Sequence, residues 1–515
     1  MNPWWKHAVC YQIYIRSFAD SDGDGIGDLA GITSRLPYLS ELGVDAIWIT
    51  PFYTSPQIDH GYDVADYRDV DPLFGDLAAF DELLAKAHAH DIRVIVDLVP
   101  NHTSSAHPWF RAALTAGAGS PERARYLFRP GDQPFNNWRS VFGGVAWEQV
   151  DDGEWYLHLF DASQPDLDWR NPEVPAMFED VLRFWLDRGV DGFRIDVAHG
   201  LFKEAGLPDQ LNPVSLEDAD DQSMIRLRPE HEPMWDQPEV HDVYRAWREI
   251  LDSYDGDRMA VAEAWTRDEA SMARYIRPDE LQQSFNFHWL TAPWSAEEFG
   301  TVVTDTLEAV ASVGASATWV LSNHDVVRHA TRYGGGAVGL ARARAALMAM
   351  LALPGSAYVY QGEELGLEQI DVPPEAWQDP RSLTLGRVGR DGCRVPLPWA
   401  GTEPPYAFGP GAGQPWIPQP LGWGSHSVAA QESDPASTLN FYREALRVRR
   451  TFAETAGDAV EVAVAGDVLT FTRGTLVCHL NTGTTPAAVP DGEVLLCSGS
   501  VPGGPNTATW LIHLA

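Results

Sequence analysis

The chain has 515 residues, of which 44% are apolar and 21% charged, a composition typical of folded globular proteins that excludes intrinsic disorder. At roughly 150 residues per domain, two to four domains are expected. The 73 acidic residues outnumber the 37 basic ones and leave a formal net charge of −36. This charge would repel nucleic acid and anionic membrane surfaces, so we expect neither as a partner, and a neutral or cationic partner suits the chain best.

The cysteines and the first residues bear on cofactors and location. The four cysteines, at positions 10, 393, 478 and 497, form no CxxC pair, so a zinc site is not expected. No basic segment followed by an apolar stretch opens the sequence, and the longest apolar run, 345–353, is too short to span a bilayer. We therefore expect a cytoplasmic protein with no membrane partner and no organic cofactor.

Short β-branched or aromatic runs alternate with longer amphipathic segments along most of the chain. Helical patterns occur between many of these runs, as at 79–90, 179–188 and 241–253. The alternation predicts an α/β protein, a (β/α)8 TIM barrel. An open doubly wound sheet is the alternative, but that fold would need a Gly-rich phosphate turn after its first strand, and the sequence has none. The expected strands are eight: 9–15, 46–50, 92–99, 192–197, 259–264, 284–287, 318–321 and 356–360.

Two segments interrupt the barrel pattern. Residues 104–173, after the third strand, are rich in Trp, Pro, Gly and Asp and are too long for a simple loop, which predicts an inserted subdomain. Residues 453–515 change to short alternating strands with Gly and Asp turns, which predicts a C-terminal antiparallel β domain. The barrel then comprises 1–103 and 174–452. Within it, 371–425 is expected to be a long ordered loop at the functional face.

Three predicted strands end in an acidic residue: Asp196, Glu263 and Asp325. The carboxyl ends of barrel strands share one face, where barrel enzymes build their sites. Arg194, two residues before Asp196, points the same way and would keep Asp196 ionised, whereas burial would keep Glu263 protonated. One carboxylate nucleophile and one carboxylic acid constitute the machinery of a retaining glycosidase. The competing interpretation is that each acid caps a helix N-terminus.

Four segments resemble, in order, the core motifs of the α-amylase family of glycoside hydrolases, glycoside hydrolase family 13: DLVPNH (97–102), GFRIDVAHG (192–200), EAW (263–265) and SNHD (322–325). The resemblance extends over the whole chain. It implies that Asp196 is the nucleophile, Glu263 the general acid/base and Asp325 a third acid that binds sugar hydroxyls. It also implies that His102 and His324 bind the same glucose ring.

Further segments resemble the α-glucosidase and oligo-1,6-glucosidase branch of this family. QPDLDW (164–169) is similar to a QPDLN segment, with Asp168 where Asn is usual, and NNWRSVFGG (136–144) also fits the branch. The resemblance implies that Phe142 and Phe160 line the sugar pocket, with Arg194 beside it. It further implies that Tyr62 stacks on the terminal glucose.

A pair of residues is expected to close one end of the pocket. In the branch that the chain resembles, the equivalents of Asp59 and Arg394 hydrogen-bond the non-reducing-end glucose. His60 and the CRVPLPW segment (393–399) depart from the usual pattern around this pair. A closed pocket implies exo-action on a short, neutral oligosaccharide or disaccharide. The competing interpretation is a surface ion pair of little consequence.

Asp20, Asp22, Asp24 and Asp28 follow the 1, 3, 5, 9 spacing of a calcium loop, with Gly at position 6 and the carbonyl of Ile26 at position 7. Position 12 is a glycine instead of the EF-hand Glu. Carboxylates packed this closely would repel one another without a cation. The branch that the chain resembles has a Ca²⁺ or Mg²⁺ loop at this place, which implies a structural cation here. A solvated acidic turn is the alternative.

The expected activity is therefore that of an exo-acting retaining α-glucosidase. The same three acids would serve a related glucosyltransferase or isomerase, of the trehalose synthase or sucrose isomerase type, in which a sugar acceptor outcompetes water. A non-catalytic relative, like the transporter heavy chains, is a remote alternative because all three acids are present here. In the family, Val after the nucleophile accompanies α-1,6 action, so Val197 inclines the prediction toward 1,6 bonds. The sequence predicts no oligomeric state.

Overall fold

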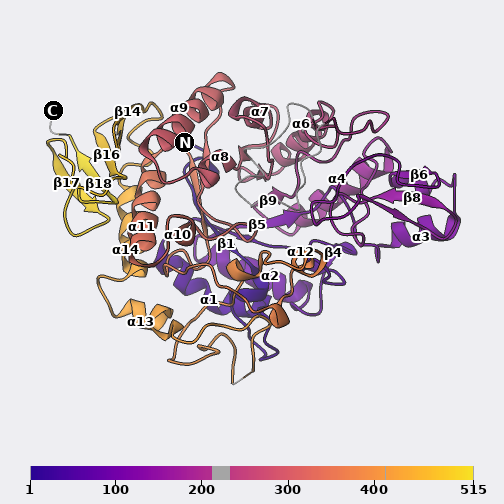
Figure 1. Cartoon of the computed structure of the whole chain (residues 1–515), viewed down its shortest axis with the longest axis horizontal. Coiled ribbons are helices and arrows are strands. Elements are labelled where there is room, and N and C mark those ends of the chain that lie inside the picture. The colour runs from indigo at the N-terminus through magenta and orange to yellow at the C-terminus, as the bar shows by residue number, and fades with distance from the viewer. Residues whose placement is uncertain (1, 212–231, 412, 514–515) are drawn as a thin grey trace.

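The computed structural model describes residues 2–211, 232–411 and 413–513. An eight-stranded parallel sheet forms its centre, in the order β11-β10-β9-β5-β2-β1-β13-β12 (Figure 1). The amide of Asn286, beyond β11, donates to the carbonyl of Thr318 in β12 at 3.0 Å and thus links the two outer strands. The expected barrel is confirmed. Its strands are β1 (Val9–Ile13), β2 (Ala46–Ile49), β5 (Arg93–Leu98), β9 (Gly192–Ile195), β10 (Met259–Ala262), β11 (Gln283–Ser284), β12 (Thr318–Val320) and β13 (Ser356–Tyr360).

Apolar side chains cover both faces of the barrel strands, as expected where helices cover the outside and side chains fill the inside. In β2, Trp48 packs with Ile95 and Tyr358 in the inner cluster. Its neighbours Ile47 and Ile49 belong to the larger cluster between strands and helices. This alternation places every second strand residue inside the barrel, and the side chains just beyond the strand ends above it.

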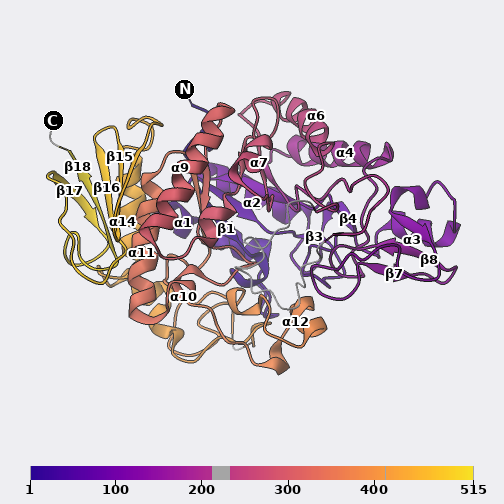
Figure 2. The ribbon, with the colours of Figure 1, turned by 45° about the horizontal axis from the view of Figure 1, so that its top comes forward.

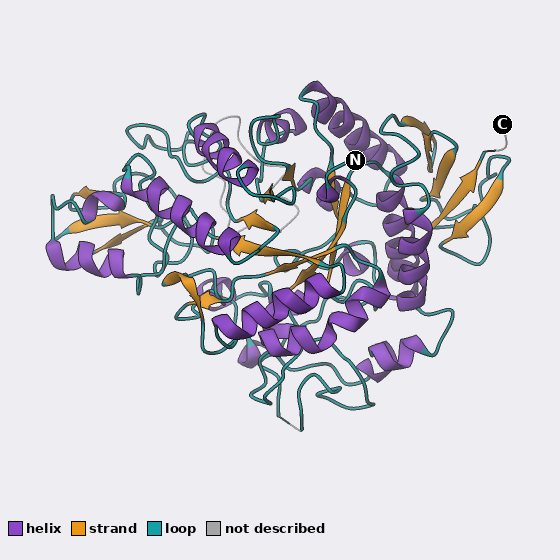
Figure 3. Cartoon of the chain, turned by 180° about the vertical axis from the view of Figure 1, so that it is seen from behind, coloured by secondary structure: helices purple, strands orange, loops and turns teal. Residues whose placement is uncertain are grey.

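Helices surround the strands, as Figure 3 shows in purple. Aspartates cap three of them: Asp28 accepts from the amide of Gly31, Asp76 from that of Ala79 and Asp268 from that of Ser271. The helical patterns expected at 79–90, 179–188 and 241–253 fall on α2, α4 and α6. The outer helices are α1 (Leu29–Leu42), α2 (Leu77–Ala89), α4 (Glu173–Asp187), α6 (Val240–Asp252), α7 (Glu269–Arg274), α8 (Phe287–Thr291), α9 (Ala296–Ser312), α10 (His329–Arg332), α11 (Gly336–Ala352) and α14 (Thr438–Arg450).

One expected strand is much shorter than its sequence pattern. The run 284–287 was expected to be extended throughout, but β11 ends at Ser284. The side chain of Asn286 accepts from the amide of Trp289 and starts α8 at Phe287. A good capping residue inside an apolar run thus ends the strand and begins a helix.

The inserted subdomain lies between β5 and α4, at one end of the molecule (Figure 1). It has its own core, in which Trp138 and Trp147 are fully buried. Its elements are α3 (Pro108–Ala116) and an antiparallel sheet of order β6-β8-β7, with β6 (Phe128–Pro130), β7 (Trp147–Gln149) and β8 (Glu154–Leu157).

The C-terminal antiparallel domain lies at the opposite end (Figures 1 and 2). It packs on α11, where the indole of Trp510 donates to the carbonyl of Met348 at 3.1 Å. The boundaries proposed at 104, 173 and 453 stay predictions. The sheet has the order β14-β15-β16-β18-β17, with β14 (Glu461–Ala465), β15 (Val468–Arg473), β16 (Leu476–Asn481), β17 (Glu493–Cys497) and β18 (Thr507–Ile512).

The remaining elements lie in the loops. The long loop after β13 carries α12 (Pro380–Leu385) and reaches the carboxyl ends of the barrel strands through Arg394. Among the helices of the described ranges, none is both long and apolar enough to cross a membrane. The other short elements are β3 (Tyr53–Thr54), β4 (Asp66–Val70), α13 (Val428–Glu432) and 3-10 turns at Trp4–Lys6, Ile15–Ser17, Arg123–Arg125, Pro374–Ala376, Asp391–Cys393 and Trp423–His426.

Candidate active site

The three predicted acids lie at the carboxyl face of the barrel. Asp196 follows β9, Glu263 follows β10, and Asp325 lies beyond β12. Asp196 and Glu263 are 6% and 8% exposed, and the Asp325 side chain is 25% exposed. None of the three accepts the side-chain capping bond of a described helix, so the interpretation as helix caps is wrong.

Arg194 connects two of these acids to a third carboxylate. Its Nη1 lies 2.6 Å from Asp196 Oδ1 and 2.9 Å from Asp97 Oδ1, and its Nη2 lies 2.9 Å from Glu263 Oε2. The reason is positional, because β9 lies between β5, which carries Asp97, and β10, which precedes Glu263. We call these four residues the nucleophile cluster. One guanidinium here serves three carboxylates.

The sequence suggested that Arg194 would simply hold Asp196 ionised, and the structure corrects this. Burial raises the pKa of Asp196 well above its usual range, Glu263 and Asp97 raise it further, and Arg194 opposes them. Burial also raises the pKa of Asp97 to about 6, against the same arginine. Because the single cation is shared, the cluster favours retention of a proton.

Glu263 has two further partners, one from the residue after Asp196 and one from two residues after Glu263 itself. The amide of Val197 donates to Oε2 at 2.8 Å, and the indole of Trp265 donates to Oε1 at 2.8 Å. Val197 has a φ of 46°, which is unusual for a β-branched residue. Its amide makes the hydrogen bond to Glu263 in this backbone conformation. Trp265 was quoted in the EAW motif but was not predicted to contact Glu263.

Asp325 is held by cations from the long loop after β13. Arg390 Nη1 and Arg394 Nη2 lie 3.1 Å and 3.0 Å from its Oδ1, and His324 Nε2 lies 3.3 Å from Oδ2. The two arginines hold the pKa of Asp325 well below its usual range despite burial. Asp325 is therefore ionised at all ordinary pH values, in contrast to the raised pKa of Asp196.

Arg390 makes the ion pair with Asp59, and the expectation that Asp59 and Arg394 bind the terminal glucose stays a prediction. Arg390 Nη2 lies 2.9 Å from Asp59 Oδ1 and 2.8 Å from Asp379 Oδ1. Arg394 instead donates to the carbonyl of His324 at 2.8 Å. The turn at Asp391–Cys393 separates the two arginines and directs them to different partners. Both arginines contact Asp325, and we call the group of Asp59, Asp325, Asp379, Arg390 and Arg394 the arginine clamp.

The inserted subdomain contributes to the wall beside the clamp. Gln164 donates to Asp59 Oδ2 at 3.1 Å and lies 3.2 Å from His102 Nε2. The Arg390 guanidinium lies 4.8 Å from the ring centre of Phe142. Phe160 packs 5.8 Å from Phe142. The structure thus brings both predicted aromatics to the site, and it adds Gln164, whose motif was noted without a role. Burial raises the pKa of Asp59 to about 6.

Tyr62 and the two predicted histidines lie next to these residues. The ring of Tyr62 stacks on His324 with centres 5.3 Å apart, and its hydroxyl donates to Asp97 Oδ2 at 3.0 Å. His102 Nε2 lies 3.1 Å from the carbonyl of Tyr62. Burial lowers the pKa of His102 to about 4 and that of His324 well below its usual value. Both imidazoles are therefore neutral, which suits hydrogen bonds with sugar hydroxyls.

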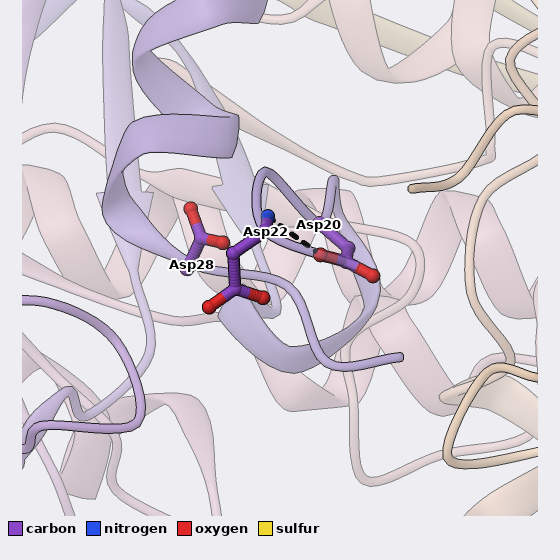
Figure 4. A group of neighbouring side chains, drawn as sticks. All are labelled: Asp20, Asp22 and Asp28. Atoms are coloured by element: carbon purple, nitrogen blue, oxygen red, sulfur yellow. Dashed lines mark hydrogen bonds between the residues drawn. The ribbon is translucent and has the colours of Figure 1, made fainter. Parts of the chain in front are cut away.

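The predicted metal loop brings three of its carboxylates together (Figure 4). Oxygens of Asp20, Asp22 and Asp28 lie within 4.8 Å of one another. Asp24 is not in this group, and its carboxylate accepts from the amide of Ile26 at 2.8 Å. Burial and the neighbouring acids raise the pKa of Asp24. An all-oxygen donor set of this kind fits a hard divalent cation such as Ca²⁺ or Mg²⁺.

Comparisons with known proteins agree with this geometry. The family model described as "Alpha amylase, catalytic domain" matches residues 12–456. A probable α-glucosidase of Rhizobium meliloti is 38% identical over 92% of this chain and 87% of its own. An oligo-1,6-glucosidase of Parageobacillus thermoglucosidasius is 36% identical over 87% and 84%. The crystal structure of an α-glucosyl transfer enzyme superposes with a TM-score of 0.87 at 38% identity, covering 100% of this chain and 99% of that one.

Proposed function

We propose that this chain, a glycoside hydrolase that belongs to the α-amylase family, is an exo-acting retaining α-glucosidase. It releases α-D-glucose from the non-reducing end of short α-glucosides such as maltose and isomalto-oligosaccharides, with sucrose as a further candidate substrate. The observation that carries the proposal is that Arg194 contacts both Asp196 and Glu263 at the barrel face. One guanidinium thereby keeps the two carboxyl groups close together, as a double displacement requires.

Asp196 and Glu263 take different parts in the reaction. Asp196 attacks the anomeric carbon while Glu263 gives a proton to the leaving oxygen, and a glucosyl ester forms on Asp196. Glu263 then takes a proton from water, which attacks the same carbon and frees Asp196. Attack requires the ionised form of Asp196, which Arg194 favours. Asp325, ionised in the arginine clamp, stabilises the positive charge that develops on the sugar.

The arginine clamp supports exo-action. Arg390 joins Asp59 and Asp325 and lies over Phe142 of the inserted subdomain, so it connects the two sides of the site. A pocket closed in this way holds one glucose unit and leaves no path for a chain beyond it. Bound glucose would contact Asp59, Arg390 and Arg394 at this end, and Tyr62, His102 and His324 at the wall.

The substrate experiment compares maltose, isomaltose, sucrose and amylose at equal bond concentration. The proposal expects glucose release from at least one disaccharide and at most slow release from the ends of amylose. Rapid loss of amylose viscosity would contradict the closed pocket. The ratio of maltose to isomaltose turnover measures the linkage preference. Val197 predicts a preference for 1,6 bonds.

Glucosyl transfer is the second candidate, favoured by the 38% identity to an α-glucosyl transfer enzyme over the full chain. The same glucosyl ester would then pass to a sugar hydroxyl instead of to water. A time course with maltose and excess acceptor sugar distinguishes the two activities. Trisaccharide formation ahead of free glucose would favour the transferase.

We further propose a structural Ca²⁺ in the loop of Asp20, Asp22 and Asp28, with Asp24 and the carbonyl of Ile26 as additional ligands and Mg²⁺ as the alternative ion. The convergence of three carboxylates supports this. Calorimetric titration of the chelator-treated protein with Ca²⁺ tests it, and an absence of binding heat would contradict it. A cytoplasmic location stays a prediction of the sequence.

A further inference from the structure

The two oxygens of Glu263 have different surroundings. Oε2 accepts from the amide of Val197 at 2.8 Å and lies 2.9 Å from Arg194 Nη2. Oε1 accepts from the indole nitrogen of Trp265 at 2.8 Å. Arg194 is permanently charged, so a proton on Oε2 would lie against a cation. The proton that Glu263 must deliver is therefore carried more favourably on Oε1.

Trp265 is fixed where it contacts Glu263. Its ring stacks on Phe287 with centres 4.0 Å apart and an interplanar angle of 22°. Phe287 is buried and begins α8, whose first turn the side chain of Asn286 caps. Only one residue separates Glu263 from Trp265, and the indole nitrogen reaches Oε1 while its ring stays stacked on Phe287.

The chemistry of the indole decides what this contact can do. Its N–H donates but cannot accept and does not titrate, so it stabilises the ionised carboxylate. A carboxylate oxygen offers two lone-pair directions, and Trp265 occupies one on Oε1. The second direction stays available for the transferred proton.

We propose that Trp265 is a positioning residue for the general acid/base: it holds Oε1, the proton-carrying oxygen, in place and sets the upper pH limit of activity. This inference rests on the proposed function. The charged groups that face Glu263 are Arg194 and Asp196, with Asp97 beyond Arg194. Trp265 acts on Glu263 without adding a charge, so its effect is separable from theirs.

The test is Trp265→Phe, which keeps a ring to stack on Phe287 and removes the N–H. Loss of the donor makes the proton of Glu263 harder to release. We expect the high-pH limb of kcat/KM for maltose to move up by about one pH unit, and kcat/KM at pH 7 to fall about tenfold. With α-glucosyl fluoride, whose leaving group needs little protonation, the loss is expected to stay below about threefold. Near-normal use of the fluoride also establishes that the variant is folded.

Two further variants make the result unambiguous. Trp294→Phe is the matched control, because the indole of Trp294 also donates a hydrogen bond, to the carbonyl of Thr482 at 3.0 Å. The high-pH limb of kcat/KM in this variant is expected to stay at the wild-type pH. Phe287→Leu removes the stacking partner and keeps the N–H, and a smaller shift in the same direction is expected. The inference would be overturned if the high-pH limb of kcat/KM did not move in Trp265→Phe, or if kcat/KM fell equally for maltose and α-glucosyl fluoride. Failure of wild-type protein to hydrolyse any of the test glucosides would instead refute the proposed function.

Discussion

The nucleophile cluster and the arginine clamp both combine arginines with three carboxylates, but in different proportions. In the cluster, Arg194 alone serves three carboxylates, and burial raises the pKa of Asp196. In the clamp, Arg390 and Arg394 together serve three carboxylates, and the pKa of Asp325 is held low. Asp325 thus has two arginines to keep it ionised, whereas Asp196 shares its single arginine with two other carboxylates. A glycosidase needs both a proton donor and a fixed negative charge within one pocket.

The largest effect is expected at the cluster. Asp196→Asn keeps the shape of the side chain and its contact with Arg194 but removes the nucleophile. Turnover of maltose should fall by about 10⁴-fold or more, with little change in the melting temperature. Steady-state rates and circular dichroism measure the two quantities. Activity within tenfold of wild type would refute the nucleophile assignment.

The next effect should appear in the clamp. Arg390→Ala removes the contacts to Asp59, Asp325 and Asp379. We expect kcat/KM for disaccharides to fall about 10²-fold with a raised KM, because the glucose is no longer oriented at the closed end. Arg447→Ala, at an exposed pair with Glu444, is the control. Equal kinetics for Arg390→Ala and wild type would show that the clamp does not bind substrate.

The pH profile separates the two regions at low pH. Burial raises the pKa of Asp59 in the clamp and of Asp97 in the cluster to about 6. Both are ionised above that pH and protonated below it, so each loses its ion pair with arginine as the pH falls through 6. We expect log kcat/KM to fall below pH 6 with a slope that approaches two. In Asp59→Asn the residual activity should fall with a slope of one, and a slope of two there would assign the whole limb to the cluster.

The smallest effect is expected on removal of the proposed cation from the metal loop. It should disturb the arginine clamp more than the nucleophile cluster. The amide of Trp416 donates to the carbonyl of Gly25 in the loop, and its ring lies 5.0 Å from His60, the neighbour of Asp59. Chelation should lower the melting temperature by a few degrees and raise KM more than it lowers kcat. Asp22→Asn should reproduce this loss, and Asp151→Asn, an exposed acid of the inserted subdomain, should not. An unchanged melting temperature in chelator would contradict the proposed cation.

Periodicity and motif spacing in the sequence predicted the barrel strands and the face on which the three acids lie. Strand alternation placed Asp196, Glu263 and Asp325 on one face, since parallel strands end together. The sequence indicated Arg394 and missed Arg390, because both lie in an irregular loop and only the turn between them determines their directions. The length of β11 was missed because one capping residue, Asn286, outweighs an apolar run. The hydrogen bond from Trp265 to Glu263 was also missed, because it depends on the stack of Trp265 on Phe287, which begins α8.

The account is tested most directly by trapping the covalent intermediate. The protein is incubated with 5-fluoro-α-glucosyl fluoride, whose electron-poor ring slows hydrolysis of the ester, and is then digested and mapped by mass spectrometry. We predict one fluoroglucosyl group on the peptide that contains Asp196, and none in Asp196→Asn. A label on the peptide of Glu263 or Asp325, or wild-type turnover of the reagent with inversion at the anomeric carbon, would contradict the proposed mechanism.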